Sequence, residues 1–166
     1  MDHRQIVFCE GLSPTPPALP TPEHLHQLQQ LFQVSAFWAP ERRIEDLAAA
    51  IAHSCPVISV WNQSQLIGFA RATSDSVYRA TIWDVIIHPD YRGAGLGRQL
   101  VQTVLAHPQV NRVERVYLMT THQQSFYERI GFEPNISTTM VLHQNQASLG
   151  VQALPELLPQ QIVPEG

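Results

Sequence analysis

The chain contains few cysteines, no cluster of basic residues and no long apolar run. Its two cysteines, Cys9 and Cys55, lie far apart among the 166 residues, so we expect reduced thiols, no disulfide framework and no metal site. An α-helical membrane span needs about 20 consecutive apolar residues, and the sequence has no such run. The formal net charge of −4 and the scattered basic residues argue against a sequence-independent nucleic-acid binder.

The first residues lack two further signals. They contain neither a basic segment followed by an apolar stretch nor a Ser- and Arg-rich start, so we expect no secretory signal or transit peptide and predict a cytoplasmic protein. Hydrophobic residues make up 44% of the chain and charged residues 14%, a composition typical of a globular enzyme. The length suits one domain, which we expect over residues 1–143, with a C-terminal tail over 144–166.

Hydrophobic periodicity and turn residues predict a mixed order of strands and helices. Thr21-Pro22-Glu23 is typical of a helix start, because it supplies an N-cap hydroxyl, a first-turn proline and an acidic side chain. The predicted strands cover about Ile6–Cys9, Pro56–Trp61, Leu66–Ala72, Ile82–Ile87, Val113–Met119 and Thr138–Leu142. The predicted helices begin at Pro22 or cover Glu41–His53, Gly97–Ala106 and Gln124–Ile130.

The segment from Thr81 to Gly97 carries the most informative motif. An apolar strand leads into a proline-containing turn, and Arg92-Gly93-Ala94-Gly95-Leu96-Gly97 follows directly before an amphipathic helix. Unpaired backbone N–H groups at a helix N-terminus, a favourable helix dipole and a nearby Arg suit an anion such as a pyrophosphate. Glycines let the main chain approach that anion and adopt positive φ. The alternative is an ordinary strand-to-helix turn that needs glycine for its geometry.

Two common nucleotide loops do not fit this segment. A dinucleotide fold needs G-x-G-x-x-G, whereas the glycines here are at 93, 95 and 97. A P-loop ends in G-K-[ST], whereas Arg98-Gln99 follows here. The pattern Arg-x-x-Gly-x-Gly between a strand and a helix instead resembles the acyl-CoA loop of the GNAT superfamily of N-acetyltransferases.

Residues 113–132 contain a second motif. A short predicted helix holds Phe126 and Tyr127 and stops at Gly131, with glycine at the usual position after a helix end. A Phe-Tyr-x-x-x-Gly-Phe run also closes the CoA-binding core of the GNAT superfamily, at a similar distance after the Gly-rich loop. This resemblance covers about residues 56–142. Residues 70–75 and 80–85 resemble the cyanobacterial and plastid branch that includes the serotonin (arylalkylamine) N-acetyltransferases, some of which also acetylate protein lysines and N-termini.

The resemblance implies an α/β (α+β) fold of the GNAT type. Its twisted sheet is expected to be mostly antiparallel and splayed between the fourth and fifth strands, with helices on both faces. The implied cosubstrate is acetyl-CoA, and Thr120 stands where many members have an Asn that contacts the pantetheine arm. The residues assigned to acetyl-CoA are Val85, Ile86 and Ile87 along the arm, Arg92, Gly93, Ala94, Gly95, Leu96, Gly97 and Arg98 at the pyrophosphate, and Thr120 and Tyr127.

Acetyl transfer from a thioester to an amine sets three chemical requirements. The amine must be neutral, although the pKa of an alkyl amine is about 10. The oxyanion needs hydrogen-bond donors, and the leaving thiolate needs a proton because the pKa of a thiol is about 8.5. Tyr127 is the candidate acid, since a phenol stays protonated at neutral pH and the family uses the corresponding Tyr in this way. The alternative for Tyr127 is a buried aromatic pair with Phe126.

Asp84 is the candidate general base, because a carboxylate within an apolar strand is costly unless it is paired or used. It could act directly or through a water, and His122 is a second candidate base. The alternative is a structural carboxylate that pairs with an arginine such as Arg71 or Arg79, or that caps a turn. Strict alternation places Asp84 on the same face as Ile82, but family members often have a bulge here that changes this parity. If Asp84 points away, Thr81 or a chain of waters must serve.

Acceptor binding is assigned to Phe37, Trp38 and Trp83. Phe37-Trp38 is an aromatic pair between two predicted helices and could stack on an indole or phenol, or form a small satellite core. The chain is thus predicted to be an acetyl-CoA-dependent N-acetyltransferase that acts by direct transfer on an arylalkylamine such as serotonin. A protein lysine or N-terminal amine is the alternative acceptor, and a non-catalytic acyl-CoA-binding module is the alternative function. A tail at 144–166 leaves a homodimer open.

Overall fold

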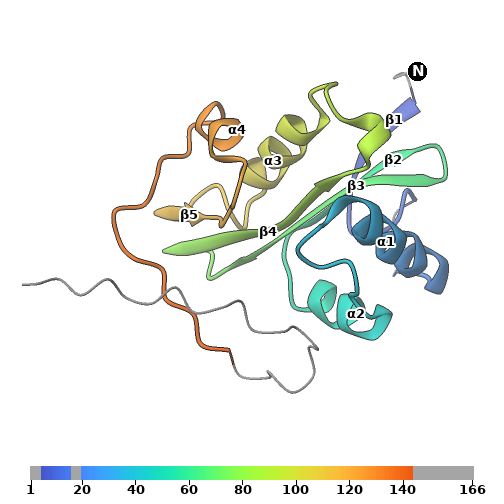
Figure 1. Ribbon diagram of the computed structural model, residues 1–166, viewed down its shortest axis with the longest axis horizontal. Coiled ribbons are helices and arrows are strands. Elements are labelled where there is room, and N and C mark those ends of the chain that lie inside the picture. The colour runs from blue at the N-terminus through green and yellow to red at the C-terminus, as the bar shows by residue number, and fades with distance from the viewer. Residues whose placement is uncertain (1–4, 16–19, 144–166) are drawn as a thin grey trace, which may run out of the picture. The chain divides into compact units, whose positions relative to one another are not determined.

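The computed structural model describes residues 5–15 and 20–143 (Figure 1). The described residues divide into one compact unit up to Glu133 and a second unit that begins at Pro134. The predicted tail over 144–166 lies outside the described residues. In the described part of the chain, no helix has both the length and the apolar content to cross a membrane.

The first unit is a five-stranded sheet with helices packed on it (Figure 1). The strands are β1 (Ile6–Glu10), β2 (Val57–Asn62), β3 (Gln65–Ser74), β4 (Arg79–Ile87) and β5 (Arg115–Tyr117), and they lie in this order. The helices are α1 (Pro22–Ser35), α2 (Ile44–Ala52), α3 (Leu96–Ala106) and α4 (Gln124–Glu128). Each of these strands and helices was predicted. The largest differences are at the start of α2, which is Ile44 and not Glu41, and at the start of β4, which is Arg79 and not Ile82.

The sheet is mixed and is splayed at one place, as predicted. Strands β1 to β4 pair in antiparallel fashion, whereas β4 and β5 are parallel. The β4–β5 pairing runs only from Arg79↔Arg115 to Thr81↔Tyr117, although β4 continues to Ile87. The second half of β4 therefore separates from β5, and its outer edge is left for another partner.

Two hydrophobic cores lie on opposite faces of the sheet. Neighbouring residues along a strand point to opposite faces, and Val60 belongs to one core while Trp61 belongs to the other. The first core is built with α3 through residues such as Leu100 and Val104. The second is built with α1 and α2 through residues that include Phe32. The α3 face and the α1–α2 face therefore offer separate surfaces to ligands at the splayed edge.

The ends of two helices show how local chemistry sets their bounds. The Thr21 hydroxyl accepts a hydrogen bond from the His24 N–H at 3.2 Å, and Pro22 occupies the first turn of α1, as predicted. Helix α2 begins later than predicted because Arg43 has an extended backbone with φ −78° and ψ 148°. Residues 36–43 are therefore a loop, and this loop carries the Phe37-Trp38 pair.

The predicted strand at Thr138–Leu142 is wrong. These residues have no regular secondary structure, and the apolar side chains of Met140, Val141 and Leu142 are exposed. A strand needs a hydrogen-bonded neighbour as well as residues with high strand propensity, and the pattern of apolar residues reported only the second condition.

Candidate active site

The Gly-rich loop has the main-chain geometry of an anion site. Gly93 and Gly95 have φ values of +82° and +81°, which L side chains rarely adopt. Gly95 is the N-cap of α3 and has no side chain to occupy the first N–H groups of the helix. An added Cβ at either glycine would meet nothing within 4 Å, so backbone conformation, and not packing, favours glycine here.

The two sequence motifs meet in space at Gly97. A Cβ built on Gly97 would lie 3.5 Å from Cζ of Phe126 and 3.8 Å from Cγ1 of Ile87. The first turn of α3 is therefore in contact with α4 and with the end of β4. The Gly-rich loop and the Phe-Tyr motif therefore lie side by side, although about 30 residues separate them in the sequence.

The geometry after α4 explains the spacing of the second motif. The Gly131 N–H donates to the Glu128 carbonyl at 3.0 Å, and the Phe132 N–H donates to the Tyr127 carbonyl at 3.1 Å. With φ +112° at Gly131, these two bonds form a Schellman motif. The turn brings the Phe132 ring to 5.9 Å from the Tyr127 ring, and Phe126 lies 4.9 Å from it on another side.

Tyr127 is half-buried at this junction. Burial raises the pKa of its phenol above the usual value of 10.0, because the charged phenolate is poorly solvated there. The hydroxyl therefore stays protonated over the whole neutral range. The aromatic pair with Phe126 that was the alternative interpretation is present, and it holds the phenol in a fixed direction.

A bulge in β4 determines which way Asp84 points. Phe69 pairs with Ile86 and Arg71 pairs with Trp83, so β4 has one residue more than β3 over this stretch. Asp84 is at the bulge with φ +55°, a conformation that Asp and Asn adopt more readily than other side chains. The parity change that the family resemblance suggested is present, and Trp83 and Asp84 both lie beside Arg71 on the α1–α2 face.

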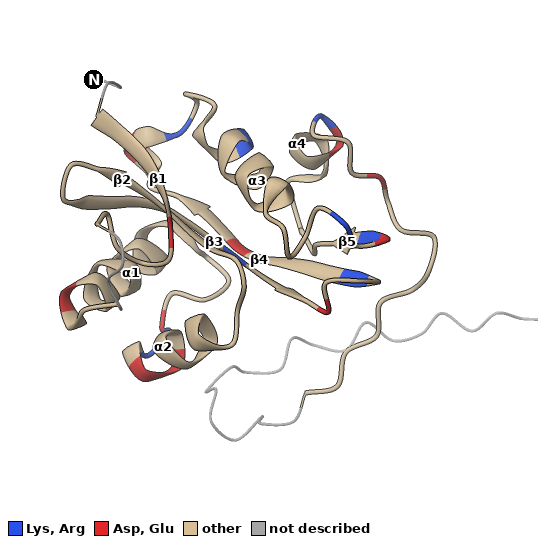
Figure 2. Ribbon diagram, turned by 180° about the vertical axis from the view of Figure 1, so that it is seen from behind, with Lys and Arg blue, Asp and Glu red and all other residues tan. Residues whose placement is uncertain are grey.

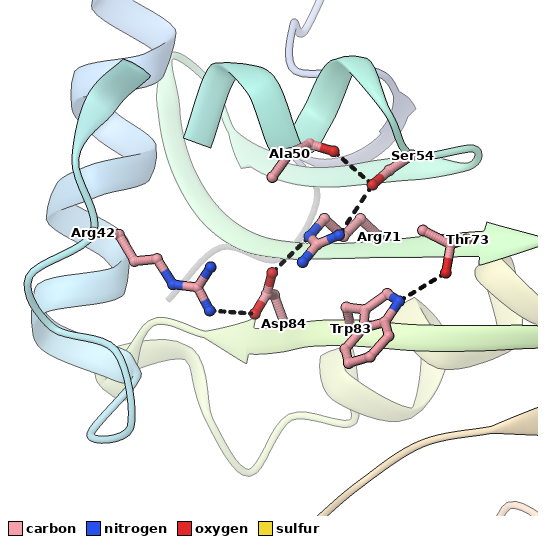
Figure 3. Close-up of polar contacts among 7 residues, drawn as sticks. All are labelled: Arg42, Ala50, Ser54, Arg71, Thr73, Trp83 and Asp84. Atoms are coloured by element: carbon pink, nitrogen blue, oxygen red, sulfur yellow. Dashed lines mark hydrogen bonds and ion pairs between the residues drawn. The ribbon is translucent and has the colours of Figure 1, made fainter. Parts of the chain in front are cut away.

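Both carboxylate oxygens of Asp84 are engaged by arginines (Figure 3). Oδ2 accepts from Nε of Arg71 at 2.6 Å, and Oδ1 lies 3.6 Å from Nη2 of Arg42. The Asp84 side chain is 7% exposed. The pairing with Arg71 was one of the two interpretations left open by the sequence, and it is compatible with a base that acts through a water. The catalytic role of Asp84 stays a prediction.

The arginine on β3 continues this network toward α2 (Figure 3). Nη1 of Arg71 donates to the Ser54 hydroxyl at 3.1 Å, and that hydroxyl donates to the Ala50 carbonyl at 2.7 Å. The Arg71 guanidinium also lies 5.8 Å from the Trp83 ring centroid. Trp83 donates to the Thr73 hydroxyl at 2.9 Å, so its ring is fixed on the same face as Asp84.

The predicted acceptor pair is exposed. Phe37 and Trp38 are 71% and 49% exposed, and their rings meet edge to face with centroids 5.2 Å apart. The Phe37 ring also lies 6.0 Å from the His122 ring, which belongs to the loop before α4. The structure thus brings together two loops that lie far apart in sequence, and it places the second candidate base beside the predicted acceptor pair.

Other predicted acetyl-CoA residues have mixed environments. Arg92 donates through Nε to the Ile87 carbonyl at 3.0 Å and through Nη2 to the Ser35 carbonyl at 3.4 Å. Thr120 accepts from the Gln123 N–H at 3.1 Å, which leaves its own hydroxyl hydrogen free to be donated. Ala94 and Arg98 are exposed and Leu96 is buried. Arg92 therefore connects the loop to β4 and α1, in addition to its predicted role at the pyrophosphate.

At the end of β4, the backbone N–H and C=O groups of successive residues point to opposite edges of the strand. The His88 N–H donates to the Ile67 carbonyl at 2.8 Å, and hydrogen-bonding direction alternates along an antiparallel pair. With Ile86 opposite Phe69 and Ile87 opposite Gly68, the polar groups of Ile86 face β3 and those of Ile87 face the splayed edge. The contact from Arg92 to the Ile87 carbonyl agrees with this direction.

Charged segments of both signs are scattered over the elements, and no described helix or strand carries a continuous basic stretch (Figure 2). Within residues 5–15 and 20–143, His, Cys, Asp and Glu side chains do not gather in threes that could hold a metal ion. The candidate site therefore consists of a Gly-rich loop with positive φ, a half-buried phenol, an arginine-bound carboxylate and an exposed aromatic pair.

Sequence reasoning missed one member of this arrangement. Arg42 has no motif around it, and its ion pair with Asp84 joins residues that are far apart in the chain. Arg71 was considered as a partner for Asp84 because both were expected in neighbouring strands. Only the position of the α1–α2 loop reveals Arg42, and no pattern in the sequence could have indicated it.

Comparison with known proteins agrees with these features. The family model described as the acetyltransferase (GNAT) family matches residues 23–132. An uncharacterized N-acetyltransferase ycf52-like protein of Prochlorococcus marinus is 42% identical over 113 residues, which are 65% of this chain and 62% of that protein. The ycf52 protein of Porphyra purpurea is 36% identical over 114 residues, which are 66% of this chain and 64% of that protein. The matched segments thus span just under two thirds of these relatives.

A relative with a named acceptor and two solved structures add to this comparison. Histone acetyltransferase TAP1 of Glycine max is 37% identical over 106 residues, which are 57% of this chain and 46% of that protein. A GNAT family acetyltransferase from Streptococcus pneumoniae has a TM-score of 0.66 at 20% identity, covering 85% of this chain and 99% of that one. The ribosomal-protein-S18-alanine N-acetyltransferase of Escherichia coli has a TM-score of 0.60 at 16% identity, covering 77% of each chain. At these identities the two structures support the fold alone.

Proposed function

Because the chain belongs to the GNAT family of acetyltransferases, we propose that it is an acetyl-CoA-dependent N-acetyltransferase that transfers the acetyl group directly to a primary amine. The observation that carries this proposal is the contact of Gly97 with Phe126 at the splayed edge of β4. We take the Gly-rich loop to be an anion cradle, and beside it lie the splayed half of β4 and the helix that carries Tyr127. A thioester with a pyrophosphate-bearing arm is the substrate that uses all of them.

Acetyl-CoA would be held mainly by main-chain groups. The backbone of Val85 to Ile87 would pair with the pantetheine amides, with Ile87 best directed toward them. The N–H groups from Gly93 to Arg98 would surround the pyrophosphate, since the helix dipole of α3 favours negative charge there. The Thr120 hydroxyl would donate to the arm from the other side of the splay.

The proposed reaction forms a nitrogen–carbon bond and breaks the carbon–sulfur bond of the thioester. The amine attacks the acetyl carbonyl, and the tetrahedral intermediate collapses with loss of the thiolate. Tyr127 donates its proton to this thiolate. The proton that the amine loses goes to Asp84 through a water, because the carboxylate is nearly buried and held by Arg71.

An arylalkylamine is one candidate acceptor. Phe37 and Trp38 form an aromatic surface beside His122, and Trp83 adds an indole on the same face as Asp84. Aromatic pairs prefer offset or edge-to-face arrangements with centroids roughly 4.5–7 Å apart, which an indole or phenol can extend. This arrangement supports serotonin or a related amine as a substrate.

A polypeptide amine is the second candidate, and the exposure of the aromatic pair favours it. Phe37 and Trp38 are open to solvent, whereas a small amine is usually enclosed on most of its surface. A relative named as a histone acetyltransferase is consistent with a polypeptide acceptor. Two Arabidopsis thaliana relatives are named as chloroplastic, and a cytoplasmic location stays a prediction for this chain.

The deciding experiment is thiol release from acetyl-CoA with a panel of amines. The panel contains serotonin, tryptamine, tyramine, spermidine, a Lys peptide and a peptide with a free N-terminus. The chain has no lysine, since its basic residues are all Arg, so acetyl-lysine found by mass spectrometry must come from the acceptor. Release with indole amines alone supports the arylalkylamine, and release with peptides alone supports the polypeptide. Acetyl-CoA binding without release for any acceptor would contradict the proposal and favour a binding module.

A further inference from the structure

One arginine of the loop between α1 and α2 adds an ion pair with β4 to the apolar packing of Ala36 and Ala39. Arg42 lies in this loop, close to Phe37 and Trp38 in sequence, and its guanidinium reaches Asp84 at the β4 bulge at 3.6 Å. The guanidinium carbon is 5.6 Å from the Phe32 ring centroid, and the Arg42 carbonyl accepts from the Gln29 side chain at 2.9 Å. Both ends of the residue are therefore anchored.

Asp84 links the two ends of α2 to the bulge. One of its oxygens contacts Arg42, before the start of α2, and the other contacts Arg71, which reaches Ser54 after the end of α2 (Figure 3). The carboxylate is nearly buried, so its ion pairs are screened less by salt than surface pairs. The neighbouring Arg43 is different, because it pairs with Glu45 where both side chains are 72% exposed.

From this arrangement we infer that Arg42 is a positioning residue, which fixes the α1–α2 loop and its Phe37-Trp38 pair against the Asp84 bulge so that the acceptor amine meets the thioester. This inference rests on the proposed function, in which Phe37 and Trp38 bind the acceptor. Arg42 need not touch either substrate. Its effect is expected on acceptor binding and not on acetyl-CoA, since the cradle for acetyl-CoA is on other elements.

The kinetic test compares Arg42→Met, Arg42→Lys and Arg43→Met in the full chain. Arg42→Met keeps apolar cover over Phe32 but removes the charge, and we expect KM for the best acceptor of the panel to rise about tenfold, because small misplacement of a substrate is costly. KM for acetyl-CoA should stay within about twofold. Arg42→Lys should recover most of the loss, and Arg43→Met should behave as wild type.

A second readout needs no acceptor. Hydrogen exchange followed by mass spectrometry should show faster exchange over residues 36–43 in Arg42→Met, and unchanged exchange there in Arg43→Met. In a double-mutant cycle, Phe37→Ala and Arg42→Met should be non-additive in acceptor KM, because both act through the same loop.

Each outcome separates the inference from the function on which it rests. Unchanged acceptor KM and unchanged exchange in folded Arg42→Met would overturn the inference. An equal rise in both KM values with a lowered Tm would also overturn it, since Arg42 would then only stabilise the fold. If wild-type protein transfers acetyl to no amine, the proposed function fails, and the exchange measurement alone decides whether Arg42 holds the loop.

Discussion

The two faces of the sheet differ in the kind of groups that they offer to the proposed ligands. On the α3 face and at the splayed edge, recognition of acetyl-CoA would use main-chain groups, made available by positive φ at Gly93 and Gly95. On the α1–α2 face, the site is made of side chains from separate elements, with Asp84, Arg42 and Arg71 at its centre. The first kind of site depends on local backbone conformation, and the second depends on how distant segments pack.

This difference between the faces indicates where side chains can be substituted without loss of acetyl-CoA binding. A main-chain cradle recognises its ligand through backbone groups that every residue carries, so few side chains there set specificity. Side chains such as Phe37 and Trp38 can change without altering the cradle, and they lie in a loop with high exposure. We therefore expect changes on the two faces to affect different kinetic constants, and four predictions test this separation.

The largest effect is expected at Tyr127, the proposed proton donor to the thiolate. Tyr127→Phe removes the proton donor but keeps the ring that packs against Phe126 and Phe132. We expect kcat to fall about a hundredfold, with acetyl-CoA affinity within about twofold of wild type, as measured by steady-state thiol release and calorimetry. Tyr78→Phe, at an exposed tyrosine, is the matched control. An unchanged kcat would remove Tyr127 from the proposed mechanism.

On the cofactor side, Gly95→Ala tests the main-chain cradle. The φ of +81° at Gly95 is unfavourable for Ala, although a Cβ there would meet nothing within 4 Å. The backbone strain should therefore destabilise this conformation of the loop by roughly 1–2 kcal/mol. We expect Kd for acetyl-CoA to rise about tenfold and acceptor KM to change little. Gly11→Ala imposes similar strain at φ +86° outside the loop. Equal weakening of acetyl-CoA binding in both variants would contradict a local role for Gly95.

On the acceptor side, Phe37→Ala and Trp38→Ala should leave the cradle intact. Loss of one aromatic contact should cost about 1 kcal/mol, so we expect acceptor KM to rise about fivefold and Kd for acetyl-CoA to stay the same. Tyr78→Ala removes an exposed aromatic side chain in the turn before β4 and serves as control. A rise in Kd for acetyl-CoA in the Phe37 or Trp38 variants would show that the two faces are not separate.

The smallest effect concerns stability at high pH. Burial raises the pKa of Tyr127 above 10.0 in the folded protein, so the folded state holds this proton more tightly than the unfolded state. Its contribution is fully present below about pH 10 and is lost as the pH rises through the folded-state pKa. Between about pH 9 and 11, the free energy of unfolding measured in urea should decline less for Tyr127→Phe than for wild type. An equal decline in the two proteins would mean that burial of the phenol does not affect stability.

The sequence predicted the cofactor face better than the acceptor face. Gly95 and Gly131 were identified because positive φ leaves a local signature, and the order of strands followed from periodicity. Arg42 was missed because its ion pair with Asp84 depends on where a loop lies in space. The strand expected at Thr138–Leu142 is not formed, because propensity alone does not supply a neighbouring strand.

The direction of Asp84 could not be obtained from alternation alone. A bulge changes the face of every later residue relative to strict alternation, and the sequence of β4 contains no glycine to mark one. The resemblance to a known family suggested the bulge, and the register between Arg71 and Trp83 and between Phe69 and Ile86 locates it. Only with this register do Asp84, Arg71 and Arg42 fall on one side.

The bulge also shows that one residue of β4 is not needed for the alternation of its core residues. Ile82 and Ile87 lie in the α3 core and Ile86 in the opposite core, and a strand without Asp84 would keep all three on the same faces by plain alternation. The bulge thus adds to β4 an acidic residue outside the pattern that places these isoleucines in their cores. Its contacts are with Arg71 and Arg42 on the acceptor side.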